Sequence, residues 1–302
     1  MKDDIRDYAR LGLVHHLLFP RCMDDADHHA ATLAKFVGRS DIETLDCCIP
    51  YGEGRRARLV PLVRRCGKEV VYATHLFPLR KIAFATTSPP EQGLVRTVLR
   101  DQVAMAAAIG AKGMIFASGA DVAEAERPAA RAAFADFCRW LCAQLEPHGI
   151  TAMLEPFDRT IDKRFLYGPS VECVELIRSL EGEADNLGIE LDMAHLPLMG
   201  ESFAHAIRTC APYLRRVHLG NCVLRDTASP LYGDQHPPIG IEGGEIDVPQ
   251  VAEILRLLLD AGYLSRERRG ALVVEMQPFP GRSAEETVLD SMQRVLTAWH
   301  EV

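Results

Sequence analysis

Short runs of β-branched and large apolar residues recur along the chain, and a longer stretch with helical spacing follows each run. We count eight such pairs. Most of the runs begin without polar alternation, as expected for strands that are buried on both faces of a parallel sheet. The predicted strands are 12–18, 42–47, 69–75, 113–117, 150–155, 188–192, 216–219 and 271–275.

Eight strand–helix units predict an α/β protein with a single domain, a (β/α)₈ TIM barrel covering residues 1–302. No Pro/Gly/Ser-rich linker divides the units. A doubly wound open sheet is the alternative, but it gives no reason for eight evenly spread units, and the chain has no glycine-rich phosphate fingerprint. Two helix starts carry capping boxes, formed by Asp247 with Gln250 and by Ser283 with Glu286.

One connection is much longer than the others. Residues 221–245, between the last two predicted strands, contain Gly, Pro, Asp and His without a clear helical pattern. A long loop after a barrel strand lies on the C-terminal rim, where active sites are built. This loop is therefore expected to be functional.

Charge and composition narrow the class of protein. The 34 Lys and Arg against 42 Asp and Glu give a net charge of −8, which disfavours a nucleic-acid partner. No apolar run reaches the roughly 18 residues of a membrane span, and the charged first ten residues do not resemble a signal peptide. We therefore expect a cytoplasmic protein with no membrane partner. The nine cysteines contain no C-x-x-C pair, which predicts reduced thiols that mostly serve packing.

Four polar residues close the last four predicted strands: Glu155, Asp192, His218 and Glu275. In a closed parallel barrel these strand ends meet at one rim. Three carboxylates and an imidazole cannot all be ionised and unpaired there, and a divalent cation resolves the conflict. Oxygen-rich ligation with one histidine suits Mn²⁺, Mg²⁺, Co²⁺ or Zn²⁺. The alternative is four independent residues in helix caps or ion pairs.

The motifs around these residues resemble the xylose isomerase-like TIM-barrel superfamily and, within it, the ketose 3-epimerase and sugar isomerase branch. They are Leu154-Glu155-Pro156, Leu191-Asp192-Met193-Ala194-His195, Val217-His218-Leu219-Gly220 and Val274-Glu275. The resemblance implies that Glu155, Asp192, His218 and Glu275 ligate one catalytic divalent metal. It also implies that His195 contacts a substrate oxygen.

Such a cation polarises a substrate carbonyl and its neighbouring hydroxyl and stabilises an enediolate. The resemblance implies that Glu155 and Glu275 lie on opposite faces of the substrate and alternate as proton acceptor and donor. Transfer between opposite faces inverts a carbinol centre, and transfer between adjacent carbons interconverts aldose and ketose.

Two positions depart from the epimerase pattern. Where the epimerases carry a second glutamate, this chain has Ile161, followed by Asp162. Where they carry a substrate-binding arginine, it has Leu224, with Arg225 next to it, so Arg225 is the candidate for that role. The charged stretch 157–164 offers alternative substrate contacts or is a solvated loop.

The long loop contains Asp234-Gln235-His236, which resembles the endonuclease IV branch, where such a pair holds an additional zinc. That branch also needs histidines after strands three and four. His75 follows strand three, but strand four ends in Phe116-Ala117-Ser118-Gly119. We expect Asp234 and His236 to be substrate or gating residues or structural residues of the loop, and a second metal is a further alternative.

Two other histidines are candidates for the substrate pocket. His15 and His16 lie in the first predicted strand, so only one of them can face the barrel interior, and His16 is our candidate. His75 closes the third predicted strand. For each, a histidine satisfied within the core is the competing interpretation.

The sequence thus predicts a metal-dependent isomerase or epimerase of carbohydrate metabolism, with one divalent ion and a small sugar or keto-polyol as substrate. Manganese is one of the suitable ions, and the resemblance implies a homodimer or homotetramer. A lyase or dehydratase is the alternative, because the same enediolate can expel a β-hydroxyl. An endonuclease-like phosphodiesterase and a non-catalytic sugar-binding barrel are the remaining alternatives.

Overall fold

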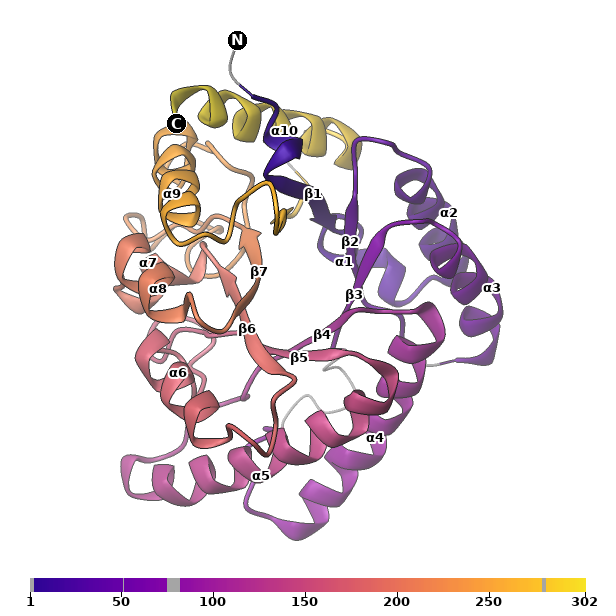
Figure 1. Ribbon diagram of the computed structural model, residues 1–302, viewed down its shortest axis with the longest axis vertical. Coiled ribbons are helices and arrows are strands. Elements are labelled where there is room, and N and C mark those ends of the chain that lie inside the picture. Colours follow the sequence, from indigo (N-terminus) through magenta and orange to yellow (C-terminus); the bar gives the residue numbers. More distant parts are fainter. Residues whose placement is uncertain (1–2, 51, 75–81, 279–280) are drawn as a thin grey trace.

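The computed structural model describes residues 3–50, 52–74, 82–278 and 281–302, which contain eight parallel strands closed into a barrel (Figure 1). Each strand pairs with its neighbour in sequence, and β1 closes the ring against β8. This confirms the predicted (β/α)₈ barrel. The strands are β1 (Ala9–Val14), β2 (Thr44–Cys47), β3 (Glu69–Ala73), β4 (Gly113–Phe116), β5 (Thr151–Leu154), β6 (Leu187–Asp192), β7 (Leu214–Leu219) and β8 (Gly270–Val274).

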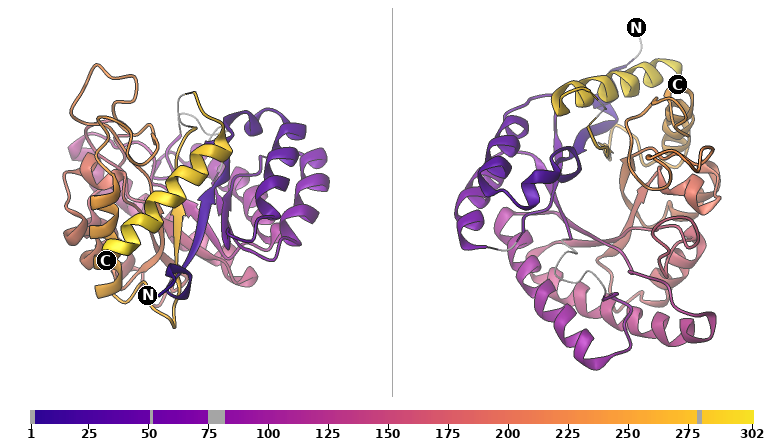
Figure 2. Two further views of the ribbon diagram at one scale, coloured as in Figure 1. Left: turned by 90° about the horizontal axis from the view of Figure 1, so that it is seen from above. Right: turned by 180° about the vertical axis from the view of Figure 1, so that it is seen from behind.

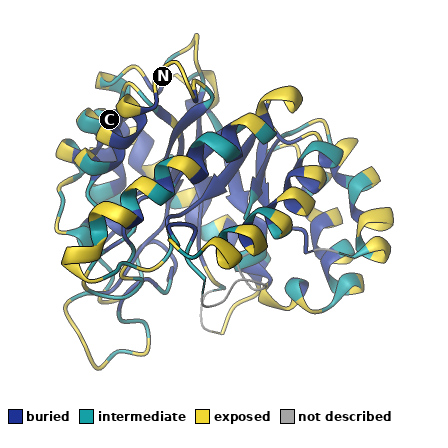
Figure 3. Cartoon of the chain, turned by 90° about the horizontal axis from the view of Figure 1, so that it is seen from below, coloured by how far each residue is buried: buried dark blue, intermediate teal, exposed yellow. Residues whose placement is uncertain are grey.

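Helices surround the barrel with their outer faces exposed, whereas the strands are buried (Figure 3). No helix in the described ranges has the length and apolar character needed to cross a bilayer. The α-helices are α1 (His15–Leu18), α2 (Ala26–Val37), α3 (Glu53–Arg64), α4 (Pro89–Ile109), α5 (Arg127–Leu145), α6 (Ser170–Ser179), α7 (His195–Met199), α8 (Phe203–Cys210), α9 (Val248–Asp260) and α10 (Ala284–Glu301); the short 3₁₀ helices are η1 (Ile5–Asp7), η2 (Pro20–Met23), η4 (Glu124–Glu126) and η5 (Glu146–His148).

The first strand differs from its prediction. β1 begins at Ala9 and ends at Val14, and the residues from His15 to Leu18 form the short helix α1. The apolar run continues through both elements, and such a run does not separate a buried strand from a buried helical turn. His15 and His16 are therefore helical, and the expectation that they alternate along a strand is wrong.

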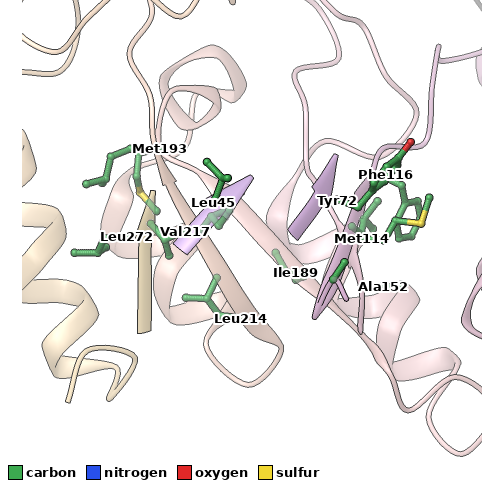
Figure 4. Packing of buried hydrophobic residues seen from close by; sticks show 14 of the residues in the cluster. Leu45, Tyr72, Met114, Phe116, Ala152, Ile189, Met193, Leu214, Val217 and Leu272 are labelled. Atoms are coloured by element: carbon green, nitrogen blue, oxygen red, sulfur yellow. The ribbon is translucent and has the colours of Figure 1, made fainter. Parts of the chain in front are cut away.

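One set of strand side chains packs outward against the helices. Leu45, Tyr72, Met114, Ala152 and Ile189 belong to one large apolar cluster that includes residues of the surrounding helices (Figure 4). Burial of this layer supplies the hydrophobic stabilisation of the fold.

The alternate set faces the inside of the barrel and is partly polar. Arg216 of β7 reaches Asp46 of β2, and these strands are not neighbours, so the contact crosses the interior. In β6, Glu190 and Asp192 alternate with Ile189 and Leu191. β6 is therefore an exception to the absence of polar alternation expected for most of the strands, and a polar set occupies the interior below the rim.

The connection from β7 to α9 contains no helix, as predicted for residues 221–245. In the side view of Figure 2 this loop projects from the end of the barrel opposite the two chain termini. Both predicted capping boxes are present, at Asp247 with Gln250 and at Ser283 with Glu286. All nine cysteines are free thiols, as expected.

Gly12 of β1 lies directly against its partner Thr44 of β2, and a Cβ at this position would come within 2.4 Å of the Thr44 carbonyl oxygen. We expect Gly12→Ala to lower the free energy of unfolding by about 1–3 kcal/mol, because two hydrogen-bonded strands would have to separate. Denaturant unfolding measures the change.

The matched control is Gly54→Ala in helix α3, where an added Cβ meets nothing within 4 Å. That substitution should raise stability by about 0.5–1 kcal/mol, because alanine is the better helix former. Equal changes in the two variants would contradict the close strand contact as the cause.

Candidate active site

The four predicted ligand residues meet at the C-terminal rim of the barrel. His218 Nδ1 lies 2.5 Å from Glu275 Oε2. Oxygens of Glu155, Asp192 and Glu275 lie within 4.8 Å of one another, and Glu155 is also grouped in this way with His218. Four strand ends thus bring three carboxylates and one imidazole into one cluster, which we call the rim cluster.

Backbone groups hold Asp192 in place. Its Oδ1 accepts hydrogen bonds from the amides of Ala194 and Gly220, at 2.9 Å and 3.1 Å. Gly220 must lack a side chain here, because a Cβ would lie 2.7 Å from that same oxygen. Asp192 Oδ2 makes no hydrogen bond, so one oxygen of this buried carboxylate remains free to bind a ligand.

Asp46 fixes the orientation of His218. The His218 Nε2 atom lies 2.8 Å from Asp46 Oδ2, on the side of the ring away from Glu275. A metal-binding histidine commonly donates its second N–H to a carboxylate in this way, which sets the tautomer and the ring direction. Sequence reasoning missed Asp46, although it is the polar residue at an inward position of β2.

Arg216 balances the charge of Asp46. Its guanidinium donates to both oxygens of Asp46, and also to Thr44 Oγ1 at 2.7 Å and to Glu69 Oε1 at 3.1 Å. Burial would lower the pKa of Arg216, but Asp46 raises it, so the guanidinium stays charged in the interior. The sequence analysis did not identify Arg216 either. The available signal was its position two residues before His218, which places both side chains on the same face of β7.

Glu190 is a second buried carboxylate below the rim. Its Oε1 lies 3.4 Å from His218 Nδ1, and neither of its oxygens makes a hydrogen bond. Burial raises the pKa of Glu190 well above its usual value. Glu190, Glu155 and His218 offer ligand atoms within 4.8 Å of one another, so Glu190 adds to the donors available to a cation. It lies two residues before Asp192 on the same face of β6, which is the signal that could have found it.

The two candidate catalytic glutamates have different pKa values because their surroundings differ. Burial raises the pKa of Glu155 to about 8. Burial would also raise the pKa of Glu275, but the rings of His218 and His236 lower it to about 2. Without a bound cation, Glu155 is therefore mostly protonated at neutral pH and Glu275 is ionised. Two titratable groups whose environments separate their pKa values can act as an acid and a base.

A cavity of about 470 Å³ opens onto the rim cluster. Glu155, His218 and Glu275 line one side of it, and its other walls include Ile115, Phe116, Phe157 and Phe165. His16 also lines the cavity, and burial lowers its pKa to about 4, so this imidazole is neutral. The volume and the mostly apolar lining are typical of a small-molecule site.

His195, Asp234 and His236 form a second cluster beside Asp192. His195 Nε2 lies 3.3 Å from Asp234 Oδ1 and 3.4 Å from Asp192 Oδ2. His236 Nε2 lies 2.8 Å from Asp234 Oδ1. The structure thus places the three predicted residues together, and Asp192, His195 and His236 offer a donor set that could hold a cation.

Two loops are joined at the mouth of the cavity. Lys163, from the loop after β5, lies 2.8 Å from Asp234 Oδ2 and donates to the Asp234 carbonyl at 3.1 Å. Asp162 accepts a hydrogen bond from the Asp234 amide at 2.8 Å. Lys163 lines the cavity, so the charged stretch 157–164 contributes a cation to the site.

Arg225 does not reach the cavity in this structure. Its side chain is 76% exposed and pairs with Glu245 at 3.1 Å. The chain turns outward after Val223, which bridges to Tyr232 and Gly233, and this turn directs Arg225 to solvent. The prediction that Arg225 contacts substrate is therefore not supported. His75 lies outside the described residues.

The chain matches one protein family in sequence and several solved structures in fold. Residues 42–298 match the family described as xylose isomerase-like TIM barrel. Similar solved structures include a D-tagatose 3-epimerase-like protein, with 15% identity, a TM-score of 0.71 and coverage of 97% of this chain and 99% of that chain. No curated protein matches the chain.

Two further structures show the same fold. A xylose isomerase domain protein from Planctomyces limnophilus has 18% identity and a TM-score of 0.66, with 97% of each chain covered. An AP endonuclease of family 2 from Brucella melitensis has 17% identity and a TM-score of 0.67, with 92% of this chain and 96% of that chain covered. At these identities the likeness establishes the fold.

Removal of the Arg216 guanidinium should strongly destabilise the folded protein. We expect Arg216→Met to lower the free energy of unfolding by about 3–5 kcal/mol, because Asp46 would remain as a buried carboxylate without its cation. Denaturant unfolding provides the measurement.

Arg215→Met is the control, because Arg215 is the preceding residue of β7 and is exposed. Its effect should stay within about 0.5 kcal/mol. A small loss at Arg216, or an equal loss at both positions, would contradict the interior ion pair as a determinant of stability.

Proposed function

Because the chain belongs to the xylose isomerase-like TIM-barrel family, we propose that it is a divalent-metal-dependent isomerase or epimerase. Its substrate is a free sugar or a closely related polyol ketone. The observation that carries the proposal is the rim cluster, in which three carboxylates and one imidazole meet and Glu155, His218 and Glu275 face one cavity. Solved structures of the same fold include proteins named as ketose epimerases, which supports this choice.

The rim cluster suits a divalent cation. Asp192 Oδ2 and both Glu190 oxygens are buried without hydrogen bonds, and Asp46 already orients His218 from behind. The residues that would hold the ion are Glu155, Asp192, His218 and Glu275. Carboxylate oxygens with one imidazole suit Mn²⁺, Mg²⁺, Co²⁺ or Zn²⁺. When bound, such an ion supplies Lewis-acid chemistry, which makes the C–H beside a carbonyl more acidic.

The two glutamates then provide the proton transfers. One glutamate, as a carboxylate, accepts the proton from the substrate carbon, and the other returns a proton to the planar intermediate. Glu155 and Glu275 exchange these two roles for the reverse reaction. Return to the opposite face of the same carbon inverts its configuration, and return to the neighbouring carbon exchanges aldose and ketose.

Other residues of the cavity bind and orient the substrate. Lys163 and His236 offer N–H donors to hydroxyl or carbonyl oxygens, and His16 offers a neutral ring nitrogen. Phe157 and Phe165, whose ring centroids lie 4.9 Å apart, cover the C–H surface of the substrate and exclude water from the proton transfer.

A dehydratase is the second candidate, and one observation favours it. Burial would lower the pKa of His236, but Asp234 raises it to about 9, so a protonated imidazole lines the cavity. That group could donate a proton to a departing β-hydroxyl. The phosphodiesterase alternative has less support, because Ser118 follows β4 where that branch carries a histidine.

The metal site is tested with Mn²⁺, which prefers oxygen ligands. We expect one Mn²⁺ per chain in the wild-type protein and none in the Asp192→Asn/His218→Ala double variant, measured by calorimetric titration and by metal analysis after dialysis. The fold should persist, because barrel stability comes from the packed interior.

The control double variant is Asp226→Asn/His205→Ala, which changes the same residue types at exposed positions. It should bind Mn²⁺ as the wild type does. Stoichiometric Mn²⁺ in the Asp192/His218 variant would refute the proposed ligand set.

The reaction class is tested by isotope exchange. Incubation with ketoses in D₂O should place deuterium on a substrate carbon and give an isomeric product without loss of water. Glu155→Gln and Glu275→Gln should each lower turnover by about 10²–10⁴-fold, because an amide cannot carry the proton. Mass spectrometry measures both the exchange and any loss of water.

Glu253→Gln, at an exposed position of α9, is the control and should retain turnover. If every accepted substrate loses water and none shows exchange or isomerisation, the dehydratase replaces the isomerase. Normal turnover in either glutamate variant would assign the proton transfer to another residue.

A further inference from the structure

Three potential metal ligands meet behind the cavity wall, away from the rim cluster. His15 begins α1, Cys22 lies in η2 and His29 lies in α2, and all three side chains are fully buried. One ligand atom from each lies within 4.8 Å of the other two. None of the three lines the cavity, whereas the neighbouring His16 does.

The hydrogen bonds favour one tautomer of His15. Thr32 Oγ1 lies 2.8 Å from the His28 carbonyl, to which it can donate its proton, and its lone pairs are then available to accept a proton from His15 Nε2, which lies 3.0 Å away. In that tautomer His15 carries its proton on Nε2 and a lone pair on Nδ1. The Nδ1 atom makes no hydrogen bond.

His29 has even fewer partners. Neither of its ring nitrogens makes a hydrogen bond, and its ring stacks on that of His15 with centroids 5.3 Å apart. The Cys22 carbonyl lies close to the ring and has a second lone pair besides the one that accepts a hydrogen bond from Arg55 at 2.6 Å, so it can favour a proton on one ring nitrogen while the other nitrogen keeps its lone pair. Buried polar atoms without partners are rare in folded proteins, and an ion is one of the standard explanations.

The protonation states favour binding. Burial lowers the pKa of His29 to about 4 and that of His15 well below its usual value, so both rings are neutral and offer lone pairs. Burial raises the pKa of the Cys22 thiol to about 12, so the thiol is protonated until a cation displaces the proton.

We propose that His15 Nδ1, Cys22 Sγ and one nitrogen of His29 bind a thiophilic transition-metal ion of the zinc class. Two imidazoles and a thiolate are established zinc ligands, with bonds of about 2.0–2.3 Å. In a tetrahedral site with such bonds the ligand atoms lie closer together than the 4.8 Å within which these three atoms fall, so small side-chain movements would complete the site. On binding, Cys22 releases its proton to solvent and its thiolate forms the metal bond.

The ion would connect three successive elements that form part of the cavity wall. His16 and Leu17 of α1 and Met23 of η2 line the cavity, and each lies next to or near a ligand in sequence. A bond network through α1, η2 and α2 would hold this wall in place. The role is structural, and it is independent of the proposed reaction.

Co²⁺ is the probe, because a cysteine thiolate bound to Co²⁺ gives a charge-transfer band in the near ultraviolet. The host is the Asp192→Asn/His218→Ala variant, in which the rim cluster no longer competes for the ion. We expect the band at one Co²⁺ per chain, with the release of a proton. Cys22→Ser in this host should abolish the band and weaken Co²⁺ binding by more than about 100-fold, because loss of a ligand exceeds the effect of an outer partner.

Cys173→Ser is the matched control, since Cys173 is equally buried in α6 and belongs to no such group of ligands. It should keep the band. If Cys22→Ser does not fold, His29→Gln tests the same site, because it keeps the thiol and should still lose tight binding. Absence of the band in the host, or its persistence in the Cys22→Ser or His29→Gln variant at unchanged affinity, would overturn the proposal.

Discussion

The ion pair between Arg216 and Asp46 is the interaction on which the site depends. It crosses the barrel from β7 to β2 and places a charged guanidinium among carboxylates that would otherwise repel one another. Asp46 in turn holds His218, and His218 contacts Glu275. A chain of contacts therefore leads from the barrel interior to the rim, and the orientation of His218 and Glu275 depends on the ion pair between Arg216 and Asp46.

The barrel fold could be predicted because the same pattern, an apolar run followed by a helical stretch, occurs eight times along the chain. Eight apolar runs with helical stretches between them leave few other architectures, and the strand ends then bring Glu155, Asp192, His218 and Glu275 together. The positions of His195, Asp234 and His236 followed from motifs that resemble known relatives. The role of these residues as ligands or substrate contacts stays a prediction.

Other parts were not predictable for physical reasons. Three interior residues have no distinctive motif in the sequence: Asp46, Glu190 and Arg216. Their side chains come together only because the closed barrel places the inward faces of distant strands opposite one another. Arg225 lies one residue from a family position, but a turn in the loop sends its side chain to solvent. The C-terminal end of β1 could not be predicted, because the apolar run continues from the strand into α1.

The contacts of Lys163 and Asp162 with Asp234 have a consequence for evolution and engineering. They join the loop after β5 to the loop after β7, so the two loops form one structural unit although about 70 residues separate them in sequence. A loop grafted alone from a relative would leave Asp234 without its lysine or Lys163 without its carboxylate. Recombination that alters substrate preference should therefore exchange both loops together, and natural divergence at one should be matched by change at the other.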